Sequence, residues 1–247
     1  MTPVVYKHNG TGFGNLVILM ADCQDKCHLI HEDVLKYELG NCISIGHFHL
    51  TSIEGTHPEC NIYINDHTVN NIHPRIRSFI SPTEYMKSML NDRVHLLDGV
   101  SACVHIRRGS YSKEGIAQGH DPEYYYCSDS GLAKFEDIIR NEPGRIYLAS
   151  DSAEVKQNMK NKFGNKIVTL DTSFACISTR HDADQYERKA LQDIYLEWFL
   201  ISMCPKVYVT GGRTDFVGFS TFGYSAAIYG AKPFGIVFND TPPATNP

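Results

Sequence analysis

The feature that most constrains the fold is a regular alternation of short apolar runs and helical patterns in the second half of the chain. Runs of strand length occur at 100–106, 145–150, 166–170, 206–210 and 233–238. Helical patterns separate them, mainly at 122–140, 152–163, 183–203 and 220–230. Strands that alternate with helices predict an α/β fold, in which a parallel sheet has helices on both faces.

The first half of the chain begins with a similar unit. A strand-like segment at 4–6 precedes a turn at 9–15 that holds three glycines, and a helical pattern follows at 16–27. Glycines permit the close approach of a ligand and a helix start favours anions, so Gly12 and Asn15 are candidate binding residues. A turn of this composition also occurs for purely structural reasons, and the residues alone leave both interpretations open.

A further helix is predicted at 82–90. Ser81 is expected to cap it, and Pro82 is expected at its first position, where proline is favoured. The polar stretch that follows this helix is a candidate boundary. We therefore expect two domains, 1–97 and 98–247.

Composition narrows the classes of function. The chain has 247 residues, 42% of them hydrophobic, and a net charge of -5. These values indicate an ordinary folded protein and argue against nucleic-acid binding, which needs a basic surface. No apolar run approaches the roughly 20 residues that cross a bilayer, and the N-terminus lacks the pattern of a signal peptide. We expect a cytoplasmic protein without a membrane span.

The cysteines are expected to be free buried thiols rather than disulfides, because several lie in apolar, strand-like contexts. There are eight: Cys23, Cys27, Cys42, Cys60, Cys103, Cys127, Cys176 and Cys204. Cys23 and Cys27 lie near two histidines, but this cluster lacks the spacing of a zinc finger or ribbon. We expect no metal site and no cofactor.

Polar residues stand at the carboxyl end of the predicted strand 100–106, where open α/β sheets bind ligands. They are His105, Arg107, Arg108 and Gly109. An arginine here can hold two phosphate oxygens with its planar fork, and the glycine lets the backbone turn beneath a ligand. Paired arginines after an apolar strand are equally consistent with a surface salt-bridge site.

Two more segments have the same character. Asp151 ends the strand 145–150, where its carboxylate can bind a ribose, a base edge or a sugar hydroxyl, or cap the next helix. Ser220, Thr221 and Phe222 begin a predicted helix. Hydroxyls and unpaired N–H groups at a helix start form an anion site, although an ordinary capped helix has the same sequence.

In their order along the chain, these segments resemble the motifs of the fucosyltransferases that form 1,2-, 1,6- and protein O-linked fucose. The segment from His105 to Tyr111 resembles their His-x-Arg-x-Gly-Asp motif, with Ser110 in place of the aspartate. Residues 148–151 resemble their second motif, and residues 199–204 followed by 220–227 resemble their third. The glycine turn at 10–15 is similar to the start of the 1,2-linking group.

The resemblance implies a GT-B architecture of two small Rossmann-like domains, with acceptor binding in the first and donor binding in the second. It implies a metal-independent, inverting transfer of fucose from GDP-fucose to a glycan hydroxyl. Arg107 would hold the β-phosphate and His105 would contact the nucleotide. Ser220 and Thr221 would bind the phosphates, and Glu197 falls where the family's helix has an acid.

The general base has three candidates, Asp121, Glu123 and His120, which follow the first motif closely. An aspartate before proline is also often a turn residue. Three rival functions stay open: the same fold with a UDP-sugar such as UDP-xylose, a non-catalytic nucleotide- or glycan-binding module, and a metal-dependent hydrolase. The last is disfavoured because the twelve histidines are scattered.

Overall fold

The centre of the fold is a five-stranded parallel sheet with strand order β10-β9-β6-β7-β8. The computed structural model describes residues 4–6, 13–14, 17–18, 28–31, 42–45, 49–51, 76–77, 79–108, 126–171, 188–215 and 219–240. The strands are β6 (Val100–Ile106), β7 (Arg145–Ser150), β8 (Ile167–Val168), β9 (Val207–Thr210) and β10 (Phe234–Val237). The predicted parallel sheet is therefore confirmed.

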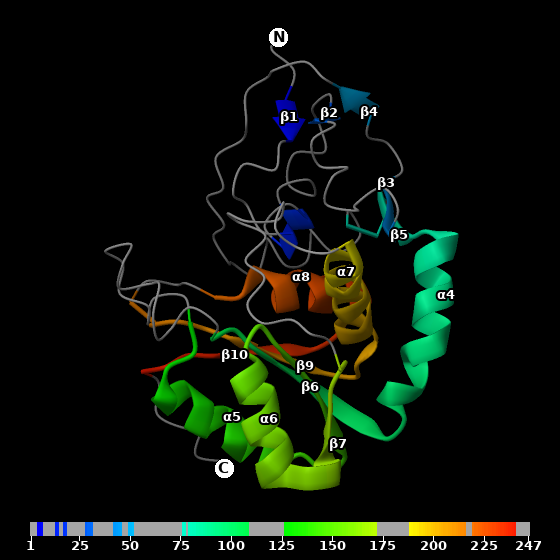
Figure 1. Ribbon diagram of the computed structural model, residues 1–247. Helices are drawn as coiled ribbons and strands as arrows, with labels where there is room; N and C mark the ends of the chain where they lie inside the picture. The colour runs from blue at the N-terminus through cyan, green and yellow to red at the C-terminus, as the bar shows by residue number, and fades with distance from the viewer. Residues whose placement is uncertain are drawn as a thin grey trace.

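Helices cover both faces of this sheet, as the alternating pattern predicts (Figure 1). On one face lie α5 (Asp129–Asn141) and α6 (Ala153–Phe163). On the other lie α7 (Arg188–Met203) and α8 (Thr221–Gly230). Successive side chains of a strand point to opposite faces, so β6 is buried on both sides: Val104 packs with the α5–α6 layer and Cys103 with the α7–α8 layer.

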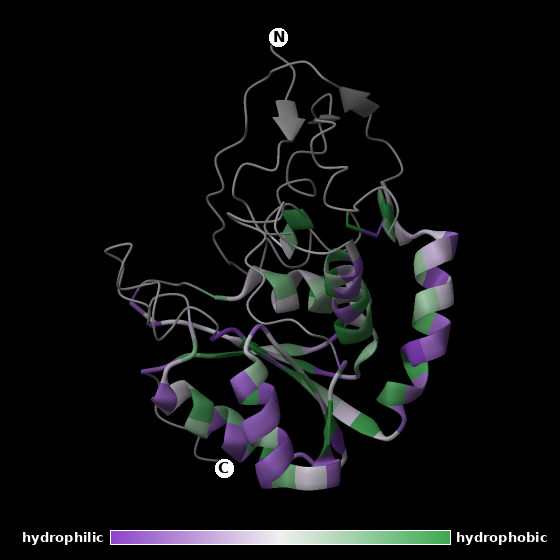
Figure 2. Cartoon of the chain, in the orientation of Figure 1, coloured by the Kyte–Doolittle hydropathy of each residue, from purple (hydrophilic) through white to green (hydrophobic). Residues whose placement is uncertain are grey.

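The α7–α8 layer is buried from two directions. Figure 2 shows α7 and α8 as largely hydrophobic, whereas α6 is largely hydrophilic. Phe13, from the first half of the chain, packs edge-on against Tyr195 and Trp198 of α7 at centroid distances of 4.9 and 5.3 Å. A helix that is apolar around most of its circumference needs such cover on both sides. The first half of the chain therefore completes the core above the sheet.

The first half of the chain contributes two smaller sheets. A parallel sheet has the order β1-β2-β4, formed by β1 (Val4–Tyr6), β2 (His28–His31) and β4 (His49–Thr51). An antiparallel pair joins β3 (Ile43–Ile45) to β5 (Ile80–Pro82). The parallel sheet agrees with the predicted α/β character of this half. The division at 97 and 98 stays a prediction.

Element ends differ from the predictions where turn chemistry decides them. Helix α4 (Glu84–Arg93) begins after Pro82, which ends β5, so Ser81 is not its cap. Thr83 is the cap, because its hydroxyl accepts a hydrogen bond from Met86 N–H at 3.2 Å. A short 3-10 helix, η2 (Val94–Leu97), follows α4.

Two other predicted boundaries are also corrected. The helix predicted to start at 122 begins at Asp129 in the described part of the chain, because the Ser128 hydroxyl accepts from Gly131 N–H and caps it there. The strand predicted at 166–170 is shortened to β8, since η4 (Gly164–Lys166) takes its first residue. The predicted cap Ser152 of α6 is confirmed.

The hydroxyls on either side of Pro82 allow a matched test of the cap. Thr83→Ala is expected to lower the free energy of unfolding by about 1 kcal/mol, because the Met86 N–H loses its acceptor. Ser81→Ala is the control and should change it by less than about 0.5 kcal/mol, since Ser81 is exposed. Urea unfolding of both variants decides the matter, and equal losses would contradict the assignment.

Candidate functional site

The candidate site lies at the carboxyl edge of the main sheet, where β6, β7 and β9 end side by side. Thr210, at the end of β9, joins the two predicted phosphate-binding segments. Its hydroxyl accepts from Arg107 N–H at 3.0 Å and donates to His105 O at 3.1 Å. Its carbonyl accepts from Ser220 N–H at 2.7 Å. The structure thus brings together the arginine segment and the start of α8, which are more than a hundred residues apart in sequence.

The start of α8 has unused hydrogen-bonding capacity. Ser220 is the N-cap residue, but its buried hydroxyl makes no capping bond and has no partner among the described residues. No described residue accepts from the N–H groups of Thr221, Phe222 or Gly223. These donors lie at the positive end of the helix dipole. A buried polar atom without a partner costs about 1–3 kcal/mol, so this arrangement suits an external acceptor such as a phosphate oxygen.

The opposite end of α8 is capped by described residues. Arg77 Nε donates to Tyr229 O at 2.6 Å, and its guanidinium lies over the Tyr229 ring at 5.6 Å. Ala231, in the left-handed conformation, donates to Ile228 O, and Lys232 N–H donates to Ala227 O. The open start of α8 is therefore a local feature of that end and does not extend along the helix.

Two glycines allow close packing at the first turn of α8. A Cβ atom on Gly223 would lie 2.8 Å from Nδ1 of His105, so the glycine lets the imidazole rest against the helix. A Cβ atom on Gly14 would lie 2.4 Å from the carbonyl carbon of Thr221. Gly14 therefore contacts the helix start, a contact that sequence reasoning did not find. The predicted residues Gly12 and Asn15 lie outside the described part of the chain.

His105 is a buried neutral imidazole. Burial, followed by the nearby charges of Arg107 and Lys156, lowers the pKa of His105 to about 3. Its ring lies 5.5 Å from that of Phe222, with a tilt of 36°. Nδ1 has no hydrogen-bond partner among the described residues. At neutral pH the ring therefore offers hydrogen bonds without adding charge.

Arg107 and Arg108 have different surroundings. The Arg107 guanidinium lies 4.9 Å from the centre of the Tyr126 ring, and no carboxylate of the described residues pairs with it. Arg108 is held by its own chain: Nη1 donates to Cys127 O at 2.8 Å, and Nη2 pairs with Asp129. Arg107 is thus the guanidinium that can turn to a ligand. A ligand contact by Arg108 stays a prediction.

Asp151 does not cap helix α6, because its neighbour Ser152 has that role. Asp151 Oδ1 accepts from Arg108 N–H at 2.7 Å, while the Ser152 hydroxyl caps α6 by accepting from Val155 N–H. The carboxylate therefore fixes the backbone of the arginine segment. Ligand binding by Asp151 stays a prediction.

Glu197 lies in a buried ion pair. Its Oε1 is 3.2 Å from Lys156 Nζ, and the two side chains are only 10% and 9% exposed. Burial raises the pKa of Glu197, against the opposing effect of Lys156. The pair joins α6 to α7 across the carboxyl edge of the sheet, close enough for Lys156 to act on His105. Direct ligand contact by Glu197 stays a prediction, and sequence reasoning missed Lys156.

Three predicted residues, Gly109, Asp121 and Glu123, lie outside the described part of the chain.

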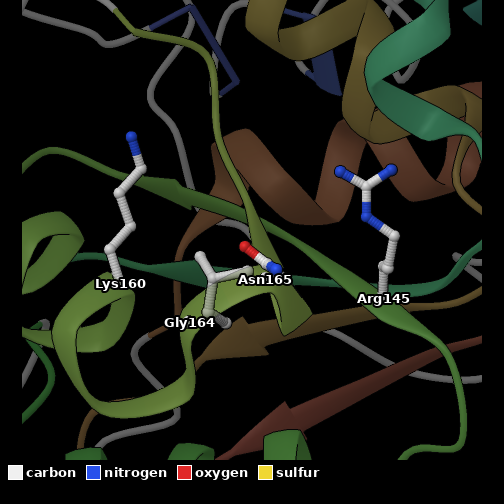
Figure 3. A pocket seen from close by; sticks show the side chains of 5 residues that line it. Arg145, Lys160, Gly164 and Asn165 are labelled. Carbon is white, nitrogen blue, oxygen red and sulfur yellow. The ribbon is translucent and has the colours of Figure 1, made fainter.

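A hollow of about 700 Å³ lies away from the candidate site, near the amino ends of β7 and β8 (Figure 3). Lys160 and Arg145 lie on either side of Gly164 and Asn165 there. Lys160 Nζ pairs there with Asp171, and Arg145 Nη1 donates to the backbone carbonyl of Asp98.

Among the described residues, no group of three or more His, Cys, Asp or Glu side chains is arranged to hold a metal ion. No described helix combines the length and apolar character of a membrane span. Cys42, Cys103, Cys127 and Cys204 are buried thiols outside any disulfide, which confirms the expectation for these four. The other four cysteines lie outside the described residues.

The comparisons with known proteins identify the fold. No protein-family model and no curated protein matches the sequence. Among solved structures, the chain is similar to the fucosyltransferase NodZ from Bradyrhizobium, with a TM-score of 0.53 and 14% identity over 91% of each chain. NodZ alpha-1,6-fucosyltransferase co-crystallized with GDP gives 0.53 and 12%, covering 92% of this chain and 91% of that one. The same enzyme soaked with GDP-fucose gives 0.52 and 13%, covering 92% of each. The expected fucosyltransferase-like α/β fold of GT-B type is confirmed.

Proposed function

We propose that this protein is a glycosyltransferase that uses a nucleoside diphosphate sugar as donor, with GDP-fucose as the first donor to test. One observation supports this above others. Thr210 ties the Arg107 segment to the start of α8, so the Arg107 guanidinium and the first N–H groups of α8 stand at one edge of the sheet. Among the described residues, no carboxylate pairs with this guanidinium and no group accepts from these N–H groups. The likeness to a GDP-binding fucosyltransferase over most of the chain supports the same donor class.

In this proposal the diphosphate lies between Arg107 and the start of α8. The planar guanidinium takes two oxygens of the β-phosphate, while the Ser220 hydroxyl and the N–H groups of Thr221 and Phe222 donate to the remaining oxygens. His105, being neutral, contributes a hydrogen bond to the nucleotide and does not compete for the charge. Gly109, Gly12 and Asn15 are proposed to bring backbone close to the donor.

The proposed reaction is an inverting transfer to a glycan hydroxyl. The acceptor oxygen attacks the anomeric carbon as the bond to the diphosphate breaks, through an oxocarbenium-like transition state. Negative charge grows on the leaving diphosphate, and Arg107 with the dipole of α8 stabilises it without a metal ion. Asp121 or Glu123 is proposed to take the acceptor's proton. The first 97 residues are proposed to bind the acceptor and residues 98–247 the donor.

A thermal-shift panel of GDP, GMP, UDP and GDP-fucose tests this function, with EDTA present in every arm. A ligand at about one hundred times its Kd adds about 2.7 kcal/mol to the free energy of unfolding, which raises Tm by about 5–10 °C for a chain of this size. We expect GDP and GDP-fucose to give such shifts and GMP to give a much smaller one, because it lacks the β-phosphate.

The other outcomes of the panel separate the rival functions. A shift with UDP and none with GDP would replace the donor by a UDP-sugar. Shifts with GDP-fucose but no release of GDP in the presence of glycan acceptors would favour a binding module. Absence of a shift with every nucleoside diphosphate would refute the proposed site.

A further inference from the structure

We propose that Asn239, just beyond β10, is a positioning residue that holds Tyr126 beneath the Arg107 guanidinium and so presets the diphosphate site. The inference rests on the proposed function, because Arg107 is assigned to the diphosphate there. Asn239 lies far from Arg107 in sequence, and no motif of the chain points to it.

The side chain of Asn239 bridges the backbone of a short segment, 126–128. Its Nδ2–H donates to Tyr126 O at 2.9 Å, and its Oδ1 accepts from Ser128 N–H at 3.0 Å. An amide side chain supplies one donor and one acceptor in a single plane, which this bridge requires. Asn239 is only 5% exposed, so neither bond can be exchanged freely for water.

The main chain of Asn239 is fixed as well. Its N–H donates to Gly212 O at 2.9 Å, and its carbonyl accepts from the Ser130 hydroxyl at 3.0 Å and from Lys134 Nζ at 2.9 Å. The bridge is thus anchored to the loop after β9 on one side and to α5 on the other. A rigidly held side chain of this kind can transmit its position to the residues it binds.

The bridged segment contacts both arginines of the site. Cys127 N–H donates to Arg107 O at 2.7 Å, and Cys127 O accepts from Arg108 Nη1 at 2.8 Å. The Tyr126 ring lies under the Arg107 guanidinium. A long arginine side chain loses rotamer freedom when it binds a ligand, so a preset guanidinium binds more tightly than a mobile one.

The packing around Asn239 shows that its neighbours leave room for the amide. A Cβ atom on Gly131 would lie 2.4 Å from Asn239 Oδ1 and 3.0 Å from Cys127 Sγ. The absence of a side chain at Gly131, the third residue of α5, therefore lets the amide reach the segment. Asn239, Gly131 and the bridged backbone form one unit.

The test compares GDP and GMP binding by titration calorimetry in Asn239→Ala, Asn239→Asp and Tyr126→Leu. We expect each variant to weaken GDP binding about three- to tenfold. This is the range expected when the cation–π contact is lost and the Arg107 side chain is no longer ordered by it. GMP binding should change less than about twofold, because the β-phosphate contact is missing from it. A merely structural residue would lower both affinities alike. Asn161→Ala, on the exposed face of α6, is the matched control.

A double-mutant cycle with Arg107→Ala separates this inference from the proposed function. If Asn239 acts through Arg107, its effect on GDP binding falls below about twofold in the Arg107→Ala background. An undiminished effect there, or equal losses for GDP and GMP, would overturn the positioning role. If Asn239→Ala does not fold, Asn239→Asp still decides, since it keeps an acceptor for Ser128 N–H but has no amide N–H to donate to Tyr126 O. Unchanged GDP binding in Arg107→Ala itself would refute the assignment of the diphosphate to Arg107, on which both proposals rest.

Discussion

Replacing Arg107 by alanine is expected to weaken GDP binding by about 10- to 100-fold, the equivalent of about 1.5–3 kcal/mol for hydrogen bonds to a charged group. Donor turnover should fall further, by about 100- to 1,000-fold, because the guanidinium stabilises charge that grows on the leaving diphosphate. The side chain has no carboxylate partner among the described residues, so its removal leaves no buried charge behind. Calorimetry and a GDP-release assay measure the two effects.

Two further variants sharpen this result. Arg107→Lys keeps the charge but loses the planar fork, so we expect an intermediate affinity. Arg140→Ala removes an exposed arginine that pairs with Asp137 on α5, and it should change neither quantity. Tm should stay within a few degrees in all three. Retention of wild-type affinity and turnover by Arg107→Ala would show that the phosphates bind elsewhere.

Breaking the buried ion pair should have the largest effect on stability. Glu197→Leu is expected to lower the free energy of unfolding by about 3–5 kcal/mol, because it leaves the Lys156 ammonium buried without its partner. Urea unfolding monitored by the fluorescence of Trp198, the next residue on the same helix, measures the loss.

The double variant Lys156→Met/Glu197→Leu separates the cost of the unpaired charge from the cost of altered packing. Apolar side chains of similar volume remove both charges, so most of the lost stability should return. Glu84→Ala breaks an exposed pair with Lys87 and should cost less than about 0.5 kcal/mol. A double variant no more stable than Glu197→Leu would mean that packing at these positions, and not the unpaired charge, sets the loss.

The sequence predicts most of the main sheet and the place of the site. Both β6 and β7 have the predicted bounds, because each is a continuous apolar run that ends in polar residues. The site follows from these strands, since parallel strands present their carboxyl ends at one edge. The sequence does not predict helix ends that depend on local turn chemistry. Two hydroxyl residues flank Pro82, and the pattern does not decide which of them caps α4.

Contacts between distant segments were beyond prediction from one sequence. Lys156 and Glu197 are separated by 41 positions, and nothing in either helix pattern indicates the partner. The glycines of segment 9–15 predict the close approach of a ligand, but nothing in the sequence indicates that Gly14 admits the backbone of Thr221. Asn239 follows the last strand in an ordinary turn context, and its role depends on where 126–128 runs in space.

Helix α8 is held at both ends by residues from the first 97 positions. Gly14 contacts its first turn and Arg77 binds its last. Any hinge motion that separated these residues from the sheet would have to release α8 at both ends. A ligand that binds the start of α8 while both contacts are intact would make opening less favourable. The free energy by which it disfavours opening would equal the binding free energy that the ligand loses when the molecule opens. Hinge closure and donor binding would therefore be thermodynamically coupled through α8.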